Sequence, residues 1–170
     1  MTTWAQRILE ANEGFDPQSW NLPPDVRALN PFEGSESDRI RSINEAFYRK
    51  FYNDDNPRKL ILGINPGRLG AGATGVPFTD TKRMEAICGI DTGDLRTHEP
   101  SSVFVYEVIE AFGGPKAFYD QLFIHSVCPL GFVKVKPNGS EVNYNYYDDK
   151  ILEQAVLPNI TDWLHRLAQW

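Results

Sequence analysis

Two short apolar runs constrain the fold of this 170-residue chain more than any other feature. The first, Lys59–Asn65, lies between a polar turn and a Pro-Gly pair, and the second, Gln121–Cys128, ends at Pro129. Both runs are typical of buried strands, and the first has the pattern of a strand buried on both faces. Because segments with helical periodicity separate them, the chain is predicted to form an α/β fold with a mostly parallel sheet.

The rest of the chain divides into helices, one linker and one hairpin. Residues 21–32 contain several prolines and are expected to form an irregular linker. A small hairpin is expected where 132–136 and 141–144 flank a Pro-Asn-Gly-Ser turn. Helices are expected over 2–13, from Ser35 or Ser37 to 51, over 80–88, from Ser101 or Ser102 to 112, briefly from Pro115, and over 148–169 with a bend at Pro158. In the helix that ends at 112, the inward-facing residues are expected to be Val105, Tyr106, Ile109 and Phe112.

The length and composition of the chain are those of a single globular domain, and we expect this domain to span residues 1–170. With only two cysteines, Cys88 and Cys128, the chain has no disulfide framework and no ligand cluster for a metal, so no cofactor is expected. No leader-like start or long apolar run occurs, which predicts a cytoplasmic protein without membrane association. A net charge of −6 argues against broad attraction to nucleic acid and leaves room only for a local basic rim.

The two strand ends carry the most informative residues. After the first strand, Gly63-Ile64-Asn65-Pro66-Gly67 is followed by Thr74-Gly75-Val76-Pro77-Phe78, and the second strand ends in His125-Ser126-Val127-Cys128-Pro129-Leu130. In this order and spacing the two motifs resemble those of the single-strand-selective monofunctional uracil-DNA glycosylases, over about residues 35 to 135. The serine in the second motif resembles the bacterial second branch of that family. The resemblance implies a three-layer αβα fold with a small, mostly parallel central sheet.

The resemblance also implies an activity and a set of roles. The chain is expected to be a DNA repair enzyme that hydrolyses the N-glycosidic bond of uracil in DNA, with DNA as its partner, as a monomer. That reaction builds positive charge on the sugar and negative charge on the departing base. Asn65 would orient the attacking water, Phe78 would stack on the flipped base, and Ser126 with the backbone near Ile64 and Gly67 would bind it.

Ser126 stands where better-known members of the family place an asparagine that pairs with uracil. A hydroxyl rotates and can both donate and accept, so it discriminates less between bases. We therefore expect a broader substrate range that includes xanthine or hypoxanthine. His125, beside it in an apolar strand, is interpreted as a hydrogen-bonded core histidine.

Basic residues near the motifs are candidates for contacts with the DNA backbone. These are Arg68, Lys82 and Lys134, with Arg83 and Lys136 beside them. Scattered surface lysines and arginines are also ordinary solvated charges, and both interpretations stay open from the sequence.

One element of the family pattern is missing. The family carries a late loop whose histidine stabilises the departing base, whereas the one histidine after the second motif is His165, in a helical context. Either the sequence lacks a C-terminal strand and this loop, which would leave a sheet edge exposed, or its branch differs. The alternative function is therefore a protein that binds flipped or damaged bases without cleaving them.

A dinucleotide-binding loop is the other pattern to weigh. Gly70–Gly75 has the G-x-G-x-x-G spacing, but it begins well after the strand, and Pro77 stands where the required helix would run. A phosphate-binding NTPase loop is excluded because no lysine precedes a serine or threonine there.

Overall fold

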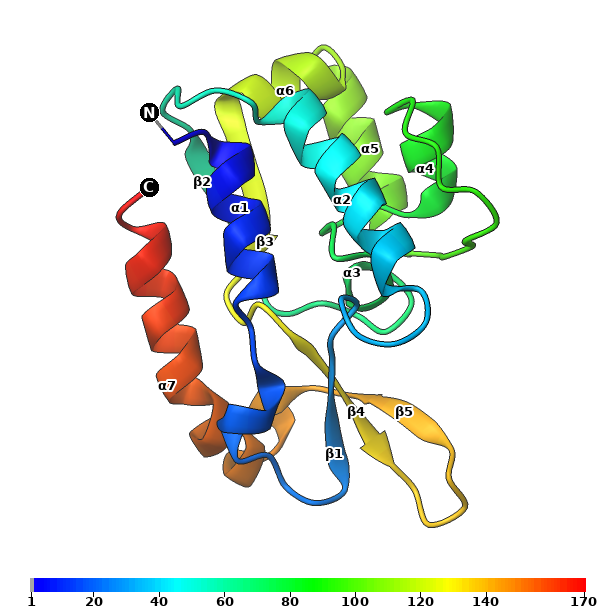
Figure 1. Cartoon of the computed structure of the whole chain (residues 1–170), viewed down its shortest axis with the longest axis vertical. Coiled ribbons are helices and arrows are strands. Elements are labelled where there is room, and N and C mark those ends of the chain that lie inside the picture. Colours follow the sequence, from blue (N-terminus) through cyan, green and yellow to red (C-terminus); the bar gives the residue numbers. More distant parts are fainter. Residues whose placement is uncertain (1) are drawn as a thin grey trace.

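A computed structural model describes residues 2–170. Its helices are α1 Trp4–Glu13, α2 Ser37–Phe51, α3 Ala71–Thr74, α4 Thr81–Ala86, α5 Ser102–Ala111, α6 Pro115–Gln121 and α7 Lys150–Leu167, with two short 3-10 helices, η1 Pro17–Trp20 and η2 Tyr146–Asp148. Its strands are β1 Val26–Leu29, β2 Lys59–Gly63, β3 Leu122–Ser126, β4 Gly131–Val135 and β5 Glu141–Tyr144. Figure 1 shows the helices gathered around β2 and β3, with the other strands at the opposite end of the molecule.

The two apolar runs pair as predicted. Strands β2 and β3 are parallel, with Lys59 opposite Leu122 and Gly63 opposite Ser126. Since parallel strands end at the same edge of a sheet, this register brings both sequence motifs to one place. The mixed helices and the parallel pair confirm the α/β fold.

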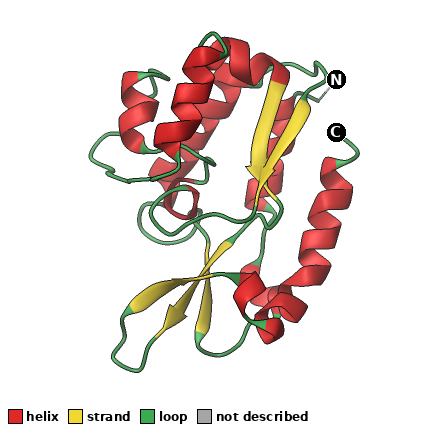
Figure 2. Ribbon diagram, turned by 180° about the vertical axis from the view of Figure 1, so that it is seen from behind, coloured by secondary structure: helices red, strands yellow, loops and turns green. Residues whose placement is uncertain are grey.

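The prediction that β2 is buried on both faces was wrong. Its three central side chains, Leu60, Ile61 and Leu62, are 41%, 40% and 37% exposed. Within residues 2–170, β2 pairs with β3 alone, so its other edge carries unpaired backbone groups. Seen from behind, no helix is drawn over the β2–β3 pair (Figure 2). In β3, by contrast, Phe123 to Ser126 are all buried.

A second sheet lies at the other end of the molecule. The expected hairpin is present as β4 and β5, which pair antiparallel. Residues 26–29, which we predicted to be irregular, form β1 and pair antiparallel with β4 from Val26 opposite Lys134 to Leu29 opposite Gly131. The strand was not predicted because its partner lies more than a hundred positions later in the chain. Strand propensity in the local sequence does not report such a distant pairing.

The helices follow their predicted positions closely, and most cover an aromatic core. Tyr106 and Ile109 of α5 are buried as expected, but Phe112 ends the helix 41% exposed. Helix α7 contains Pro158 and places Trp163 in the core against β3. Within residues 2–170, no helix is both long and apolar enough to cross a lipid bilayer.

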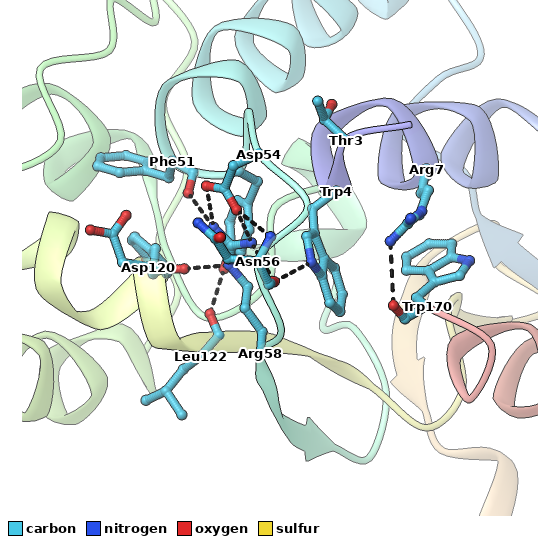
Figure 3. Close-up of polar contacts among 12 residues, drawn as sticks. Thr3, Trp4, Arg7, Phe51, Asp54, Asn56, Arg58, Asp120, Leu122 and Trp170 are labelled. Atoms are coloured by element: carbon cyan, nitrogen blue, oxygen red, sulfur yellow. Dashed lines mark hydrogen bonds and ion pairs between the residues drawn. The ribbon is translucent and has the colours of Figure 1, made fainter. Parts of the chain in front are cut away.

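The start of β2 is fixed by Arg58, whose side chain is fully buried. Figure 3 shows the polar contacts around this residue. Its guanidinium donates to both carboxylate oxygens of Asp54, at 2.8 and 2.9 Å, and to the carbonyl of Tyr119 at 2.7 Å. It also lies over the rings of Tyr52 and Trp4, at 5.0 and 5.6 Å from their centroids. The hydrogen bonds from Arg58 hold the pKa of Asp54 below its usual value. This network ties the end of α2 to both strands.

Candidate active site

A pocket opens at the carboxyl ends of β2 and β3, where ligands of open parallel sheets bind. Its lining residues are Asn65, Pro66, Gly67, Ala71, Pro77, Phe78, Glu99, Ser101 and Ser126. Asn65, Gly67, Phe78 and Ser126, which the motifs singled out, therefore meet in one place. The remaining base-binding candidate, Ile64, is 52% exposed and is not among the lining residues. Its carbonyl oxygen accepts from the Cys128 N–H at 3.0 Å.

Asn65, one of the pocket residues, carries an unused acceptor. Its Nδ2 donates to the carbonyl oxygen of Pro66 at 3.1 Å, which fixes the orientation of the amide. Its Oδ1 is buried, and it is the one such side-chain polar atom without a hydrogen-bond partner within residues 2–170. Buried polar atoms are nearly always satisfied, and an exception calls for a functional explanation. The Asn65 amide is thus prepared to accept a hydrogen bond from a bound molecule.

Phe78 is held in a backbone conformation that few side chains adopt. Its φ is +58°, in the left-handed region, which for a bulky residue marks strain or function. Its ring lies against the backbone of Gly63, in the space that a Cβ on Gly63 would need. Only glycine at the end of β2 leaves room for the aromatic ring above the strand. The pocket therefore has an aromatic wall at the end of the sheet, suited to stacking on a planar base.

Helix α2 fixes the loop that carries Phe78. The Asn44 Nδ2, fully buried, donates to the carbonyl oxygen of Thr74, and the Tyr48 hydroxyl donates to that of Gly75 at 3.3 Å. On the other side of Phe78, the hydroxyl of Thr79 hydrogen-bonds the Tyr106 hydroxyl at 2.7 Å. These anchors supply the packing that offsets the strain at Phe78.

Ser126 is 2% exposed and closes the pocket from the end of β3. Its carbonyl oxygen accepts from the Trp163 Nε1 at 3.0 Å, so α7 fixes this end of the strand. His125 is buried beside it, with its ring 4.8 Å from that of Trp163. Burial lowers the pKa of His125 to about 4, so the imidazole is neutral at physiological pH. This burial supports its interpretation as a core histidine.

Sequence reasoning missed Glu99 and Ser101, which reach the pocket from the segment before α5. Asp80, 1% exposed at the start of α4, positions that segment by accepting from the Glu99 N–H at 3.4 Å and the Ser102 hydroxyl at 3.1 Å. Arg83 pairs with the same carboxylate at 2.8 Å. No motif marked Glu99, because its place in the pocket depends on how this long connection folds back.

The basic candidates differ in where they lie. Arg68 is exposed in the loop directly after Gly67, and Lys82 is exposed on α4. Lys134 lies on β4, where it pairs with Asp25 at 3.1 Å and lies over the ring of Tyr144 at 4.7 Å. Its charge is already engaged within the second sheet, away from the pocket lining. His165 is exposed on α7 and likewise does not line the pocket.

The pocket offers amide, hydroxyl and carboxylate groups rather than a metal site. Across residues 2–170, no three histidine, cysteine or acidic side chains gather in a way that would hold a metal ion. The chemistry of the site is that of an ordered polar pocket with one aromatic wall.

Parts of the chain are similar in sequence to known proteins. The uracil DNA glycosylase superfamily model matches residues 49–169. The single-strand selective monofunctional uracil DNA glycosylase of Bos taurus is 28% identical over 115 residues, 57% of this chain and 41% of that protein. Its counterpart in Rattus norvegicus is 30% identical over 91 residues, 44% of this chain and 33% of that protein. The chain thus spans well under half the length of these relatives.

A solved structure matches almost the whole chain. The crystal structure of wild-type SMUG2 from Pedobacter heparinus is 48% identical, with a TM-score of 0.91, and the match covers 99% of this chain and 71% of that one. This likeness places the chain in the same fold. The chain belongs to the uracil DNA glycosylase superfamily, in its SMUG-type branch.

Proposed function

We propose that this chain is a monofunctional DNA glycosylase that removes uracil from DNA by hydrolysing the N-glycosidic bond. The observation that carries the proposal is the unpartnered, buried Oδ1 of Asn65, in the same pocket as Phe78 and Ser126. The named activities of the relatives from Bos taurus and Rattus norvegicus support it.

The pocket suits each step of that reaction. A flipped base stacks on Phe78, and the Ser126 hydroxyl hydrogen-bonds its edge. Backbone N–H groups near Ile64 and Gly67 donate to the base as negative charge develops on it. The Asn65 Oδ1 accepts a hydrogen bond from a water molecule and directs its lone pair toward the anomeric carbon of the sugar. Water attacks C1′ as the bond to the base breaks.

The range of bases that the chain releases is proposed to depend on Ser126. Because the Ser126 hydroxyl donates or accepts according to its partner, we expect xanthine and hypoxanthine to be released as well as uracil. Comparable single-turnover rates on the three bases are the expected result, and Ser126→Asn is expected to narrow the range toward uracil. Strict uracil preference in the unaltered chain would disprove this part alone.

One observation favours a second candidate, a protein that binds damaged bases without cleaving them. The residues lining the pocket include no histidine, so no imidazole from them stabilises the departing base. Binding to uracil-containing DNA without release of uracil would identify this function.

The deciding experiment is a single-turnover assay on single-stranded and duplex DNA carrying one uracil. Asn65→Ala is compared with Asn53→Ala, an exposed asparagine outside the pocket, and the protein from Pedobacter heparinus is assayed in parallel. We expect uracil release that falls at least about a hundredfold in Asn65→Ala and stays unchanged in Asn53→Ala. Equal rates in the unaltered chain, Asn65→Ala and Asn53→Ala would overturn the role of Asn65. No release of uracil by the unaltered chain, with retained binding to uracil-containing DNA, would favour the second candidate.

A further inference from the structure

Glu99 carries the one ionisable side chain among the residues that line the pocket. It comes from the segment before α5, far from either sequence motif. A charged group in a pocket with an amide, a hydroxyl and an aromatic ring dominates the local field, because electrostatic interactions strengthen as water is excluded. Glu99 is therefore the first residue to test for a role in the chemistry of this pocket.

The Glu99 carboxylate is held in a defined position. Its Oε1 accepts from the Ser101 N–H at 3.2 Å and from the Ser101 hydroxyl at 2.8 Å. Its Oε2 lies over Gly70, in the space that a side chain there would take, and 3.8 Å from the place of a Cβ on Gly67. One carboxylate oxygen is thus anchored, while the other faces the loop that begins at Asn65.

Asn65 and Glu99 both line this pocket, and each brings an acceptor oxygen, the Asn65 Oδ1 and the Glu99 Oε2. Neither oxygen can donate to the other, so together they suit a bound molecule with two donor hydrogens. Water is the smallest such molecule. A water that donates both of its hydrogens keeps its oxygen lone pairs free to attack.

We propose that Glu99 is a second catalytic residue, which shares the attacking water with Asn65 and takes its proton. This inference rests on the proposed glycosylase function. An asparagine amide can orient a water but is too weak a base to deprotonate it, whereas a carboxylate does both. The negative charge of Glu99 also stabilises the positive charge that builds on the sugar.

The step balances without any other reactant. The water oxygen forms a bond to C1′ of the deoxyribose, and the bond between C1′ and the base nitrogen breaks. The bonding electrons leave with the base as its anion, and the water proton passes to Glu99 Oε2. The products are the base anion, which solvent protonates, and an abasic sugar with a hydroxyl at C1′.

Charged groups hold the segment that carries Glu99. Asp80 accepts from the Glu99 backbone N–H at 3.4 Å, and Arg83 pairs with the Asp80 carboxylate at 2.8 Å. His98 precedes Glu99 in the chain, and its Nδ1 lies 3.9 Å from the same carboxylate.

The kinetic test uses Glu99→Gln, which keeps the shape and the acceptor for Ser101 but cannot take a proton. Glu107→Gln, exposed on α5, is the matched control. Glu99→Gln is expected to lose at least about a hundredfold in single-turnover rate. Glu107→Gln is expected to keep the rate of the unaltered chain. A rate for Glu99→Gln equal to that of Glu107→Gln would overturn the proposal.

A binding test separates this inference from the proposed function. The probes are two single-stranded DNAs, one with a cationic 1-aza-deoxyribose and one with an uncharged tetrahydrofuran abasic site. The unaltered chain is expected to bind the cationic probe at least about tenfold more tightly, as a carboxylate beside the sugar would require. Glu99→Gln is expected to lose this preference while binding the uncharged probe as before.

Gly70→Ala gives a second, independent variant. Its new methyl group would take the space of the Glu99 carboxylate and displace it without removing its charge. It is expected to lose the preference for the cationic probe together with Glu99→Gln. A preference retained in both variants would disprove the role of Glu99. No uracil release by the unaltered chain, with a preference that still depends on Glu99, would disprove only the proposed glycosylase activity.

Discussion

The ring of Phe78 lies directly against the backbone of Gly63, in the space that any side chain at position 63 would fill. The two residues come from the first and last parts of one motif, separated by the loop that contains α3. The aromatic wall of the pocket therefore depends on the absence of a Cβ at the end of β2, and on a strained φ of +58° at Phe78.

Gly63→Ala is expected to displace the Phe78 ring and to lower both folding stability and affinity for uracil-containing DNA. Overpacking of this kind destabilises a protein by about 1–3 kcal/mol. The loss of base stacking adds about 1–3 kcal/mol of binding, because stacking of a base on an aromatic ring has that magnitude. Urea unfolding and affinity for uracil-containing DNA measure the two effects. Unchanged DNA affinity would show that Phe78 does not stack on the base.

Arg58→Met is expected to destabilise the fold by about 3 kcal/mol, because it leaves buried carbonyl groups and Asp54 without their partner. Arg49→Met, which removes only an exposed pair with Glu45 at 2.7 Å, is the control and is expected to change stability by less than about 0.5 kcal/mol. Urea unfolding of both variants provides the comparison. Similar losses of unfolding free energy in Arg58→Met and Arg49→Met would mean that the buried ion pair of Arg58 contributes no more to stability than an exposed one.

His125 is expected to make folding stability fall as the pH drops below about 6.5, the usual pKa of histidine. The folded state resists protonation down to about pH 4, because burial lowers the pKa of His125 to about 4. Below pH 6.5 the unfolded chain therefore binds more protons. The stability is complete above 6.5 and is lost progressively toward pH 4.

The measurement is urea unfolding of the unaltered chain and of His125→Gln between about pH 7 and pH 5. Over that range the unaltered chain is expected to lose about 2 kcal/mol more than the variant. Comparing the two chains cancels the titration of other groups, including Asp54. Parallel pH dependences would place the His125 pKa near its ordinary value.

Salt dependence should separate the basic residues that contact DNA from those that do not. Arg68→Ala is expected to weaken DNA binding and reduce the salt slope by about one, because one phosphate contact is lost. Lys134→Ala is expected to leave the slope unchanged, because its charge pairs with Asp25 at 3.1 Å. Fluorescence anisotropy over a range of salt concentrations measures both. A reduced slope in Lys134→Ala would restore it as a backbone contact.

The chain's local patterns were enough to predict most helices and both parallel strands. Asn65 and Ser126 lie at the ends of those strand patterns, and parallel strands bring their ends together. Gly67 and Phe78 were predicted as pocket residues only through the resemblance of their motif to that of the single-strand-selective monofunctional uracil-DNA glycosylases. Helical periodicity is equally local, which is why α2 and α7 lie where their apolar spacing indicated.

Other features depend on residues that are distant in the chain, and sequence patterns do not record such pairings. Residues 26–29 became β1 only through β4, and the apolar β2 is exposed because one of its edges has no partner within residues 2–170. Glu99 lines the pocket because Asp80 holds its segment against the loop, and the charge of Lys134 pairs with Asp25, which precedes β1. The sequence by itself determined which residues end the strands. Tertiary structure alone decided which charges meet them, since charge pairing follows distance in space rather than position in the chain.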